Sequence, residues 1–148
     1  MSMREPVRPT RLALGSLAAL AWTAVSVAHA ADELPSLRSG LWDLKRSVDD
    51  PGAAPMNVET RNCIDPSADI RRMQEAMSNR GCVYSPLEKS GNTYTLTADC
   101  KLGDATLRSR TVITVESDIA YSVAVTTTSG ERQSREMMTA RRVGDCAP

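Results

Sequence analysis

Alternation from residue to residue is clearest in the stretch Asn92-Thr93-Tyr94-Thr95-Leu96-Thr97-Ala98-Asp99-Cys100-Lys101. Apolar side chains and the cysteine occupy one set of positions, and threonines with one aspartate occupy the other. Successive side chains of a β-strand point to opposite faces, so this pattern predicts a strand with one buried and one solvated face. Ser90-Gly91 lies between this stretch and residues 82–89, which predicts a β-hairpin.

Similar patterns, bounded by Gly, Pro, Asp and Ser turn signals, predict further strands. The full set of expected strands is 40–48, 56–64, 82–89, 92–101, 105–116, 120–128 and 134–143. We therefore expect a mainly β fold, an antiparallel meander of about seven strands curled into a half-barrel or barrel. Residues 31–39 are expected to be a loosely held lead-in.

The period changes after Ile64. Asp65 is suited to cap a helix and Pro66 to occupy its first turn. Ile70, Met73 and Met77 then follow at i, i+3 and i+7, which predicts a helix of roughly 13 residues with one narrow apolar stripe. We expect this helix to pack on the sheet, with its methionines serving for packing and not as ligands.

Residues 1–30 have the organisation of a secretory signal peptide. Three arginines precede an apolar run, Leu12 to Val27, and Ala28-His29-Ala30 forms a small-x-small cleavage site. The run is too short and too diluted for a membrane span, and no basic flank follows it. The sequence predicts cleavage between Ala30 and Ala31, release into the periplasm, and a single disulfide-bonded domain over residues 31–148.

The charge balance of the expected mature domain gives no sign of a nucleic-acid partner. The whole chain has 18 Lys and Arg and 18 Asp and Glu. Residues 1–30 contain three arginines and one glutamate, so 15 basic and 17 acidic residues remain. A slightly acidic domain without a charged tail has no basic patch predicted from bulk charge.

Residue types argue against enzymatic chemistry. His29, the only histidine, lies in the cleavage site, whereas nucleophilic triads and zinc catalysis usually need histidine. The four cysteines stand 19, 18 and 46 positions apart, which fits neither a zinc site nor a C-x-x-C redox motif. Asp49-Asp50 could form a carboxylate pair but lies in a Pro-Gly turn. We expect no enzyme activity, no cofactor and no metal.

Four cysteines in an exported domain predict two disulfides, with three possible connectivities. A three-residue hairpin loop, Ser90-Gly91-Asn92, would place Cys82 opposite Cys100, close enough for a cross-strand bond. A two-residue loop would instead place Cys82 opposite Asp99. Strand parity favours Cys82 with Cys100, and Cys63 with Cys146 if the helix crosses the sheet.

Six arginines in the last part of the chain, residues 108–142, are candidates for a binding surface. If neighbouring strands align them, they could bind an anionic lipid or polysaccharide. The alternative is a solvated sheet face balanced by Glu116, Glu131 and Glu136. The residues in question are Arg108, Arg110, Arg132, Arg135, Arg141 and Arg142.

Three motifs, in order along the chain, resemble the domain of unknown function 3617 family, a group of small exported proteobacterial proteins. They are Gly40-Leu41-Trp42, Cys63-Ile64-Asp65-Pro66 and Arg142-Val143-Gly144-Asp145-Cys146, with Cys82 and Cys100 between them. The resemblance covers nearly all of the expected mature chain. It implies a periplasmic, β-rich domain and supplies no activity and no catalytic residues.

Two function hypotheses remain open. The first is a periplasmic binding module that holds a small apolar or amphipathic molecule in the curled sheet, with the helix as a lid. The second is a structural or interaction domain of the cell envelope with a filled core, whose partner would be an envelope protein. Small inward-facing residues at Ala98, Ser109 and Thr111 would leave space and favour the first.

Overall fold

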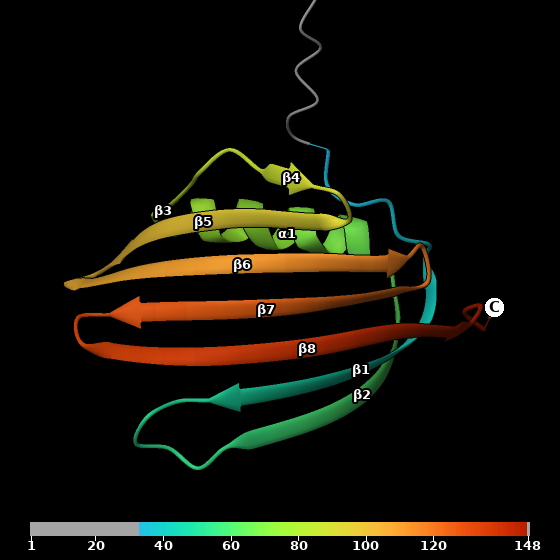
Figure 1. The fold of residues 1–148 in the computed structure, drawn as a ribbon, viewed down its shortest axis with the longest axis horizontal. Coiled ribbons are helices and arrows are strands. Elements are labelled where there is room, and N and C mark those ends of the chain that lie inside the picture. Colours follow the sequence, from blue (N-terminus) through green and yellow to red (C-terminus); the bar gives the residue numbers. More distant parts are fainter. Residues whose placement is uncertain (1–32, 148) are drawn as a thin grey trace, which may run out of the picture.

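The computed structural model describes residues 33–147 and consists of one curled antiparallel sheet with a helix on its concave face (Figure 1). The single helix of these residues is α1, Pro66–Ser78. The strands are β1 Gly40–Asp49, β2 Met56–Ile64, β3 Cys82–Tyr84, β4 Glu88–Ser90, β5 Thr93–Leu102, β6 Ala105–Ser117, β7 Ala120–Ser129 and β8 Arg132–Gly144. The predicted signal peptide and its cleavage site between Ala30 and Ala31 lie outside the described residues.

The strand order is β2-β1-β8-β7-β6-β5-β3, and β4 pairs with β5 beyond the end of β3. All of these pairs are antiparallel. The mainly β fold class with one helix is therefore confirmed. The sheet is open and not a closed barrel, because β2 and β3 form opposite edges. The chain passes from one edge to the other through α1, as the disulfide argument required.

The single strand predicted over residues 82–89 is wrong, because it is divided into β3 and β4. Ser85 still bonds to Thr97, through N–H to the Thr97 oxygen at 2.8 Å. Glu88 pairs with Thr95, so Pro86 and Leu87 together lie opposite the one residue between Thr95 and Thr97. Proline has no N–H for the sheet ladder, and two residues facing one is a β-bulge.

Because of this bulge, Cys82 and Cys100 face each other although the hairpin loop is shorter than expected. The hairpin loop has two residues, Gly91 and Asn92, because Ser90 pairs with Thr93. The expected three-residue loop is therefore wrong. The extra residue in the bulge compensates for the shorter loop, and Cys82 still lies opposite Cys100. The shorter loop and the bulge each shift the pairing by one residue, in opposite directions, so their effects on the pairing of Cys82 cancel.

Helix α1 begins as predicted, because the Asp65 carboxylate accepts a hydrogen bond from the Ala68 N–H at 3.0 Å. Ile70 packs against the main core cluster, and Met77 packs against the smaller one. Met73, predicted to share this stripe, has 66% of its surface exposed. That prediction is wrong, because a short helix lying on a curved sheet buries a narrower stripe than the spacing suggested.

The core lies where α1, the lead-in and the centre of the sheet meet. Trp42 is fully buried, and its ring meets that of Tyr121 edge-on, with centroids 5.4 Å apart. Leu37, Tyr94, Ile113 and Ala140 complete the buried cluster. Burial of three aromatic rings, those of Trp42, Tyr94 and Tyr121, with aliphatic side chains stabilises a domain that has no phenylalanine.

Candidate functional site

The lead-in segment before β1 is fixed in place, contrary to the expectation that it is loosely held. The Ser67 hydroxyl at the start of α1 donates a hydrogen bond to the Pro35 oxygen at 2.7 Å and accepts one from the Leu37 N–H at 3.0 Å. Pro35 and Leu37 are buried. One serine therefore joins the lead-in to the helix, and this contact builds one wall of a pocket.

The pocket, about 710 Å³ in volume, lies between the lead-in, α1 and the bulge that separates β3 from β4. Its apolar lining includes Leu34, Leu37, Leu87 and Leu96. Leu96 belongs to the concave face of β5 and is 5% exposed, so it forms part of the floor. The bulge brings Leu87 toward the helix, and the polar lining residues are Glu33, Ser36, Asp65, Ser67, Arg71, Gln74 and Ser85.

Helix α1 presents a polar face to this pocket. Ser67, Arg71 and Gln74 stand at i, i+4 and i+7 and all line it, as expected for one helix face. Within residues 33–147 no carboxylate lies within ion-pair distance of Arg71. The pocket therefore combines an apolar floor with a guanidinium group that has no ion-pair partner among residues 33–147.

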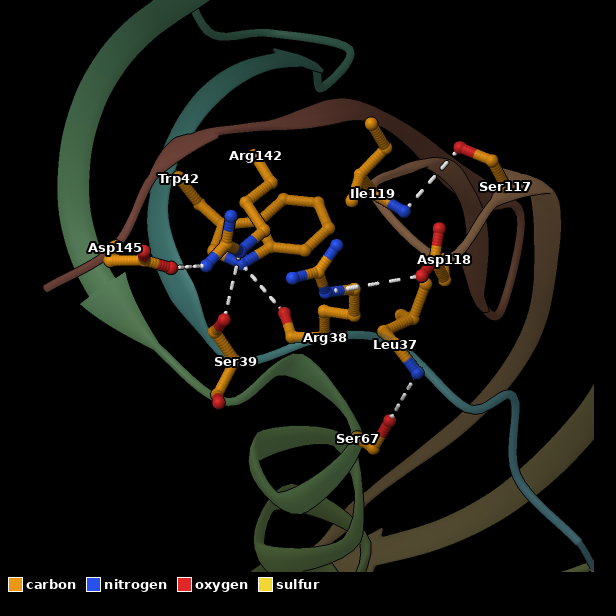
Figure 2. Close-up of polar contacts among 10 residues, drawn as sticks. All are labelled: Leu37, Arg38, Ser39, Trp42, Ser67, Ser117, Asp118, Ile119, Arg142 and Asp145. Atoms are coloured by element: carbon orange, nitrogen blue, oxygen red, sulfur yellow. Dashed lines mark hydrogen bonds and ion pairs between the residues drawn. The ribbon is translucent and has the colours of Figure 1, made fainter.

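The family-like motifs at the two ends of the domain meet in a separate cluster (Figure 2). Arg142 donates through Nε to the Ser39 oxygen at 2.8 Å and through Nη2 to Asp145. Trp42 donates through Nε1 to the Arg38 oxygen at 3.1 Å. Only 13% of the Arg142 side chain is exposed. These hydrogen bonds engage the guanidinium group and join β8 to the lead-in, so Arg142 has a structural role.

Gly40 is required at this cluster. Its φ of 152° is a conformation that favours glycine. A Cβ there would collide with Nε of Arg142 and lie 2.6 Å from the Gly144 oxygen. The first and last motifs therefore fit together directly and join β1, β8 and the lead-in.

The second motif is joined to this region by a cysteine pair. Cys63 and Cys146 are paired with Cα atoms 5.6 Å apart, and Cys82 and Cys100 with Cα atoms 3.9 Å apart. These are the pairs predicted from strand parity, and they lie at disulfide distance. Such pairs are typical of chains that fold outside a reducing cytoplasm.

The predicted arginine patch is divided among separate partners. Arg108 donates two bonds to Asp99, at 2.7 and 3.0 Å, and Arg132 donates to Asp50 at 3.3 Å. These pairs replace the balancing role expected of Glu116 and Glu131, whereas Glu136 does bind an arginine, Arg46. The remaining members, Arg110, Arg135 and Arg141, are exposed. Arg110 shares a face of β6 with Arg108, and Thr126 of β7 lies between Arg110 and Arg135, so neighbouring strands do not place two of these arginines directly opposite each other.

Arginines also hold aspartates of the sheet and of the β1–β2 turn. Hydrogen bonds from Arg61 lower the pKa of Asp43, and those from Arg108 lower the pKa of Asp99. Asp49 and Asp50 stand at the β1–β2 turn, where Asp50 contacts Arg132. Within residues 33–147 no cluster of three potential metal ligands occurs, and no helix there is long and apolar enough to cross a membrane.

Small residues do face the concave side. Ala98, Ser109, Thr127 and Ser134 are successive partners across β5, β6, β7 and β8, and Thr111 lies beside Leu96 on the same face. Ala98 packs against the Cys82–Cys100 pair, whereas Ser109 and Thr111 are half-buried. Ser109 and Thr111 therefore face inward, as the first function hypothesis requires, but neither of them lines the pocket.

A family model described as "Protein of unknown function (DUF3617)" matches residues 37–146. No curated protein and no solved structure matches the chain. The matched range includes both sides of the Trp42 cluster and all four cysteines, but starts after the first residues that line the pocket.

Proposed function

Because the chain belongs to the DUF3617 family, which is described only as being of unknown function, we propose a function from the geometry: the domain binds a small amphipathic molecule. The observation that carries this proposal is the pocket of about 710 Å³ between the lead-in and α1. Pockets for small molecules commonly measure about 300–1,000 Å³, with an apolar lining and a few polar groups that orient the ligand.

The ligand's apolar part would lie on Leu87 and Leu96, and its polar part would face Arg71 and Gln74. Helix α1 then forms a wall of the site, in the place of the lid expected from the sequence. Asp65 caps the helix through Ala68, so this carboxylate is engaged and competes less with an incoming anionic group.

The compartment is part of the proposal. The cysteine pairs support folding outside the cytoplasm, and the pattern of residues 1–30 supports export to the periplasm. Cleavage after Ala30 would leave only Ala31 and Asp32 ahead of Glu33, which lines the pocket. N-terminal sequencing of the exported protein should therefore begin at Ala31.

We propose a binding role without catalysis. The only histidine, His29, lies in the predicted leader, and the Asp49-Asp50 pair lies at the β1–β2 turn, where Asp50 contacts Arg132. The purified protein should therefore show no sustained turnover of ester, peptide or phosphate substrates that survives a second purification.

Binding is tested with a fluorescent long-chain carboxylate as the probe. The native protein should bind it saturably, and Leu87→Trp should abolish binding because the larger ring fills the pocket. Val83→Trp is the matched control, since Val83 is 72% exposed and does not line the pocket. Arg71→Glu should weaken binding of the carboxylate without changing the melting temperature. Equal binding by all four proteins, or none by the native one, would contradict the proposal.

The second hypothesis, an interaction domain, is favoured by a different observation. Strand β2 is exposed along its whole length except at Ile64, which is half-buried, and it forms a free edge of the sheet. In the strand order β2 is far from β5, which supplies Leu96 to the pocket, whereas Asp65, which directly follows β2, also lines it. The two roles are tested separately.

A further inference from the structure

The two edges of the sheet are protected very differently. On one side β3 and β4 have three residues each and are separated by a segment that contains Pro86. On the other side β2 has nine residues and pairs with β1 without a bulge or a proline. Short strands, prolines and bulges are the usual means of blocking unwanted strand pairing. Strand β2 has none of these three, and its charged side chains, Glu59 and Arg61, are each paired with an opposite charge on β1.

We propose that two copies of this chain pair through β2, antiparallel, with a two-fold axis through Thr60. The two sheets would then form one continuous sheet. The occupant of the free edge is thus a second copy of the chain, and the argument rests on the order of charges along β2.

The sequence of β2 is self-complementary in this register only. With Thr60 opposite its own copy, Glu59 faces Arg61 of the second copy, and the same contact is repeated by symmetry. A shift that centres the axis on Glu59 or on Arg61 would place like charges opposite each other. Opposite charges in directly facing cross-strand positions stabilise a pair, and like charges destabilise it.

The contacts inside each copy extend this complementarity. Glu59 lies 3.1 Å from Nζ of Lys45, and Nη2 of Arg61 lies 2.8 Å from Asp43. The dimer would therefore carry two rows of alternating charge across the joint, in the order Lys45, Glu59, then Arg61 and Asp43 of the second copy. No two adjacent side chains in either row carry the same charge.

The opposite face of β2 offers apolar surface. Val58 is 39% exposed and Met56 is 47% exposed. In the proposed register Val58 faces Asn62 of the second copy and Met56 faces Ile64. Pairing would cover part of this apolar surface, which is otherwise exposed to water at no benefit to the monomer.

Charge reversal tests the register. Sedimentation equilibrium of the purified protein over a dilution series should show a monomer–dimer equilibrium. Glu59→Lys alone or Arg61→Glu alone should each weaken dimerisation roughly tenfold, because two symmetry-related pairs change from attraction to repulsion. A mixture of the two variants should form a heterodimer, since the lysine introduced in one copy then faces the glutamate introduced in the other. Melting temperatures of the separate variants check that they fold.

Cross-linking tests the axis. Thr60→Cys should give a disulfide-linked dimer on a non-reducing gel, because the two substituted positions face each other across the axis. Asn62→Cys is the matched control and should not cross-link, because it faces Val58. A native protein that stays monomeric at every concentration would overturn the proposal. So would a dimer indifferent to charge reversal, or cross-linking by Asn62→Cys in preference to Thr60→Cys.

Discussion

Trp42 and Val48 lie on the same strand and on the same face of the sheet, yet one is fully buried and the other is only half-buried. Around Trp42 the lead-in, α1 and Arg142 cover the concave face. Around Val48 the neighbours are Met56 and Glu136, across β2 and β8, and Met56 is 47% exposed. We call these regions the closed end and the open end of the concave face.

The difference follows from the length of the covering elements. Helix α1 has 13 residues and begins directly after β2, at the closed end. The lead-in joins it there through Ser67. No further element among residues 33–147 is available for the open end of β1, β2 and β8. Stability should therefore be concentrated at the closed end, while the open end should tolerate change.

The largest expected effect is at Trp42. Trp42→Ala should lower the free energy of unfolding by about 5 kcal/mol, because a fully buried ring leaves a large cavity. Val48→Ala, the matched control on the same face, should cost only about 1 kcal/mol because the site is open to water. Chemical denaturation of both variants measures the contrast. Similar losses for the two substitutions would mean that the ends are equally packed.

Loss of the cysteine pairs should be the next largest effect. Replacing Cys63 and Cys146 by serine should cost about 4 kcal/mol, and replacing Cys82 and Cys100 about 3 kcal/mol, because the first pair closes the longer loop. Peptide mapping without reduction checks the pairing itself. A linked peptide containing Cys63 and Cys82 would contradict both the connectivity and the strand order.

The sequence predicts the strands and the helix start well because each depends on local chemistry. Alternation at residues 92–101 and the Asp65-Pro66 pair act within a few residues, and both appear in the structure as expected. The predicted hairpin loop is one residue too long, because the prediction assumed an unbroken strand over residues 82–89, whereas the bulge at Pro86 and Leu87 shifts the register by one residue.

The pocket could not be predicted from the sequence. It depends on Ser67 holding Pro35 and Leu37, residues 30 or more positions away, and nothing in the pattern of residues 31–39 indicates that contact. One feature of the sequence does point to the pocket: Ser67, Arg71 and Gln74 share one face of α1. A polar face of this kind is also found on any helix exposed to solvent, so it does not predict a pocket. Long-range contacts of this kind need the tertiary structure.

Alkaline pH should destabilise the closed end through Tyr121. Burial, with a smaller contribution from Asp69, raises the pKa of Tyr121 from 10.0 to about 12. Below pH 10 the phenol is neutral in both states. Between pH 10 and 12 it ionises mainly in the unfolded chain, so stability should fall by about 2 kcal/mol as the pH rises through that range.

Unfolding measured at several alkaline pH values should show this fall, and Tyr121→Phe should reduce it. Tyr84 is the comparison, since burial also raises its pKa but the residue is only half-buried. Tyr84→Phe should flatten the profile less than Tyr121→Phe does. The reverse order would mean that Tyr84, on the edge strand β3, is desolvated more strongly on folding than Tyr121 in the main core.

The smallest expected effect is at the open end, where Arg46 donates two hydrogen bonds to Glu136, at 2.6 and 2.7 Å. Their side chains are 48% and 29% exposed. Water screens such a pair, so Arg46→Met should lower the free energy of unfolding by only about 1 kcal/mol, and by less in high salt.

A double-mutant cycle with Glu136→Gln isolates the pair from the packing of the arginine stem. A coupling free energy well above 1 kcal/mol that persists in high salt would show that the open end is covered in solution. Because β2 pairing joins the sheets next to this site, measuring the cycle in the presence and absence of the Glu59→Lys substitution would show whether a second copy provides that cover.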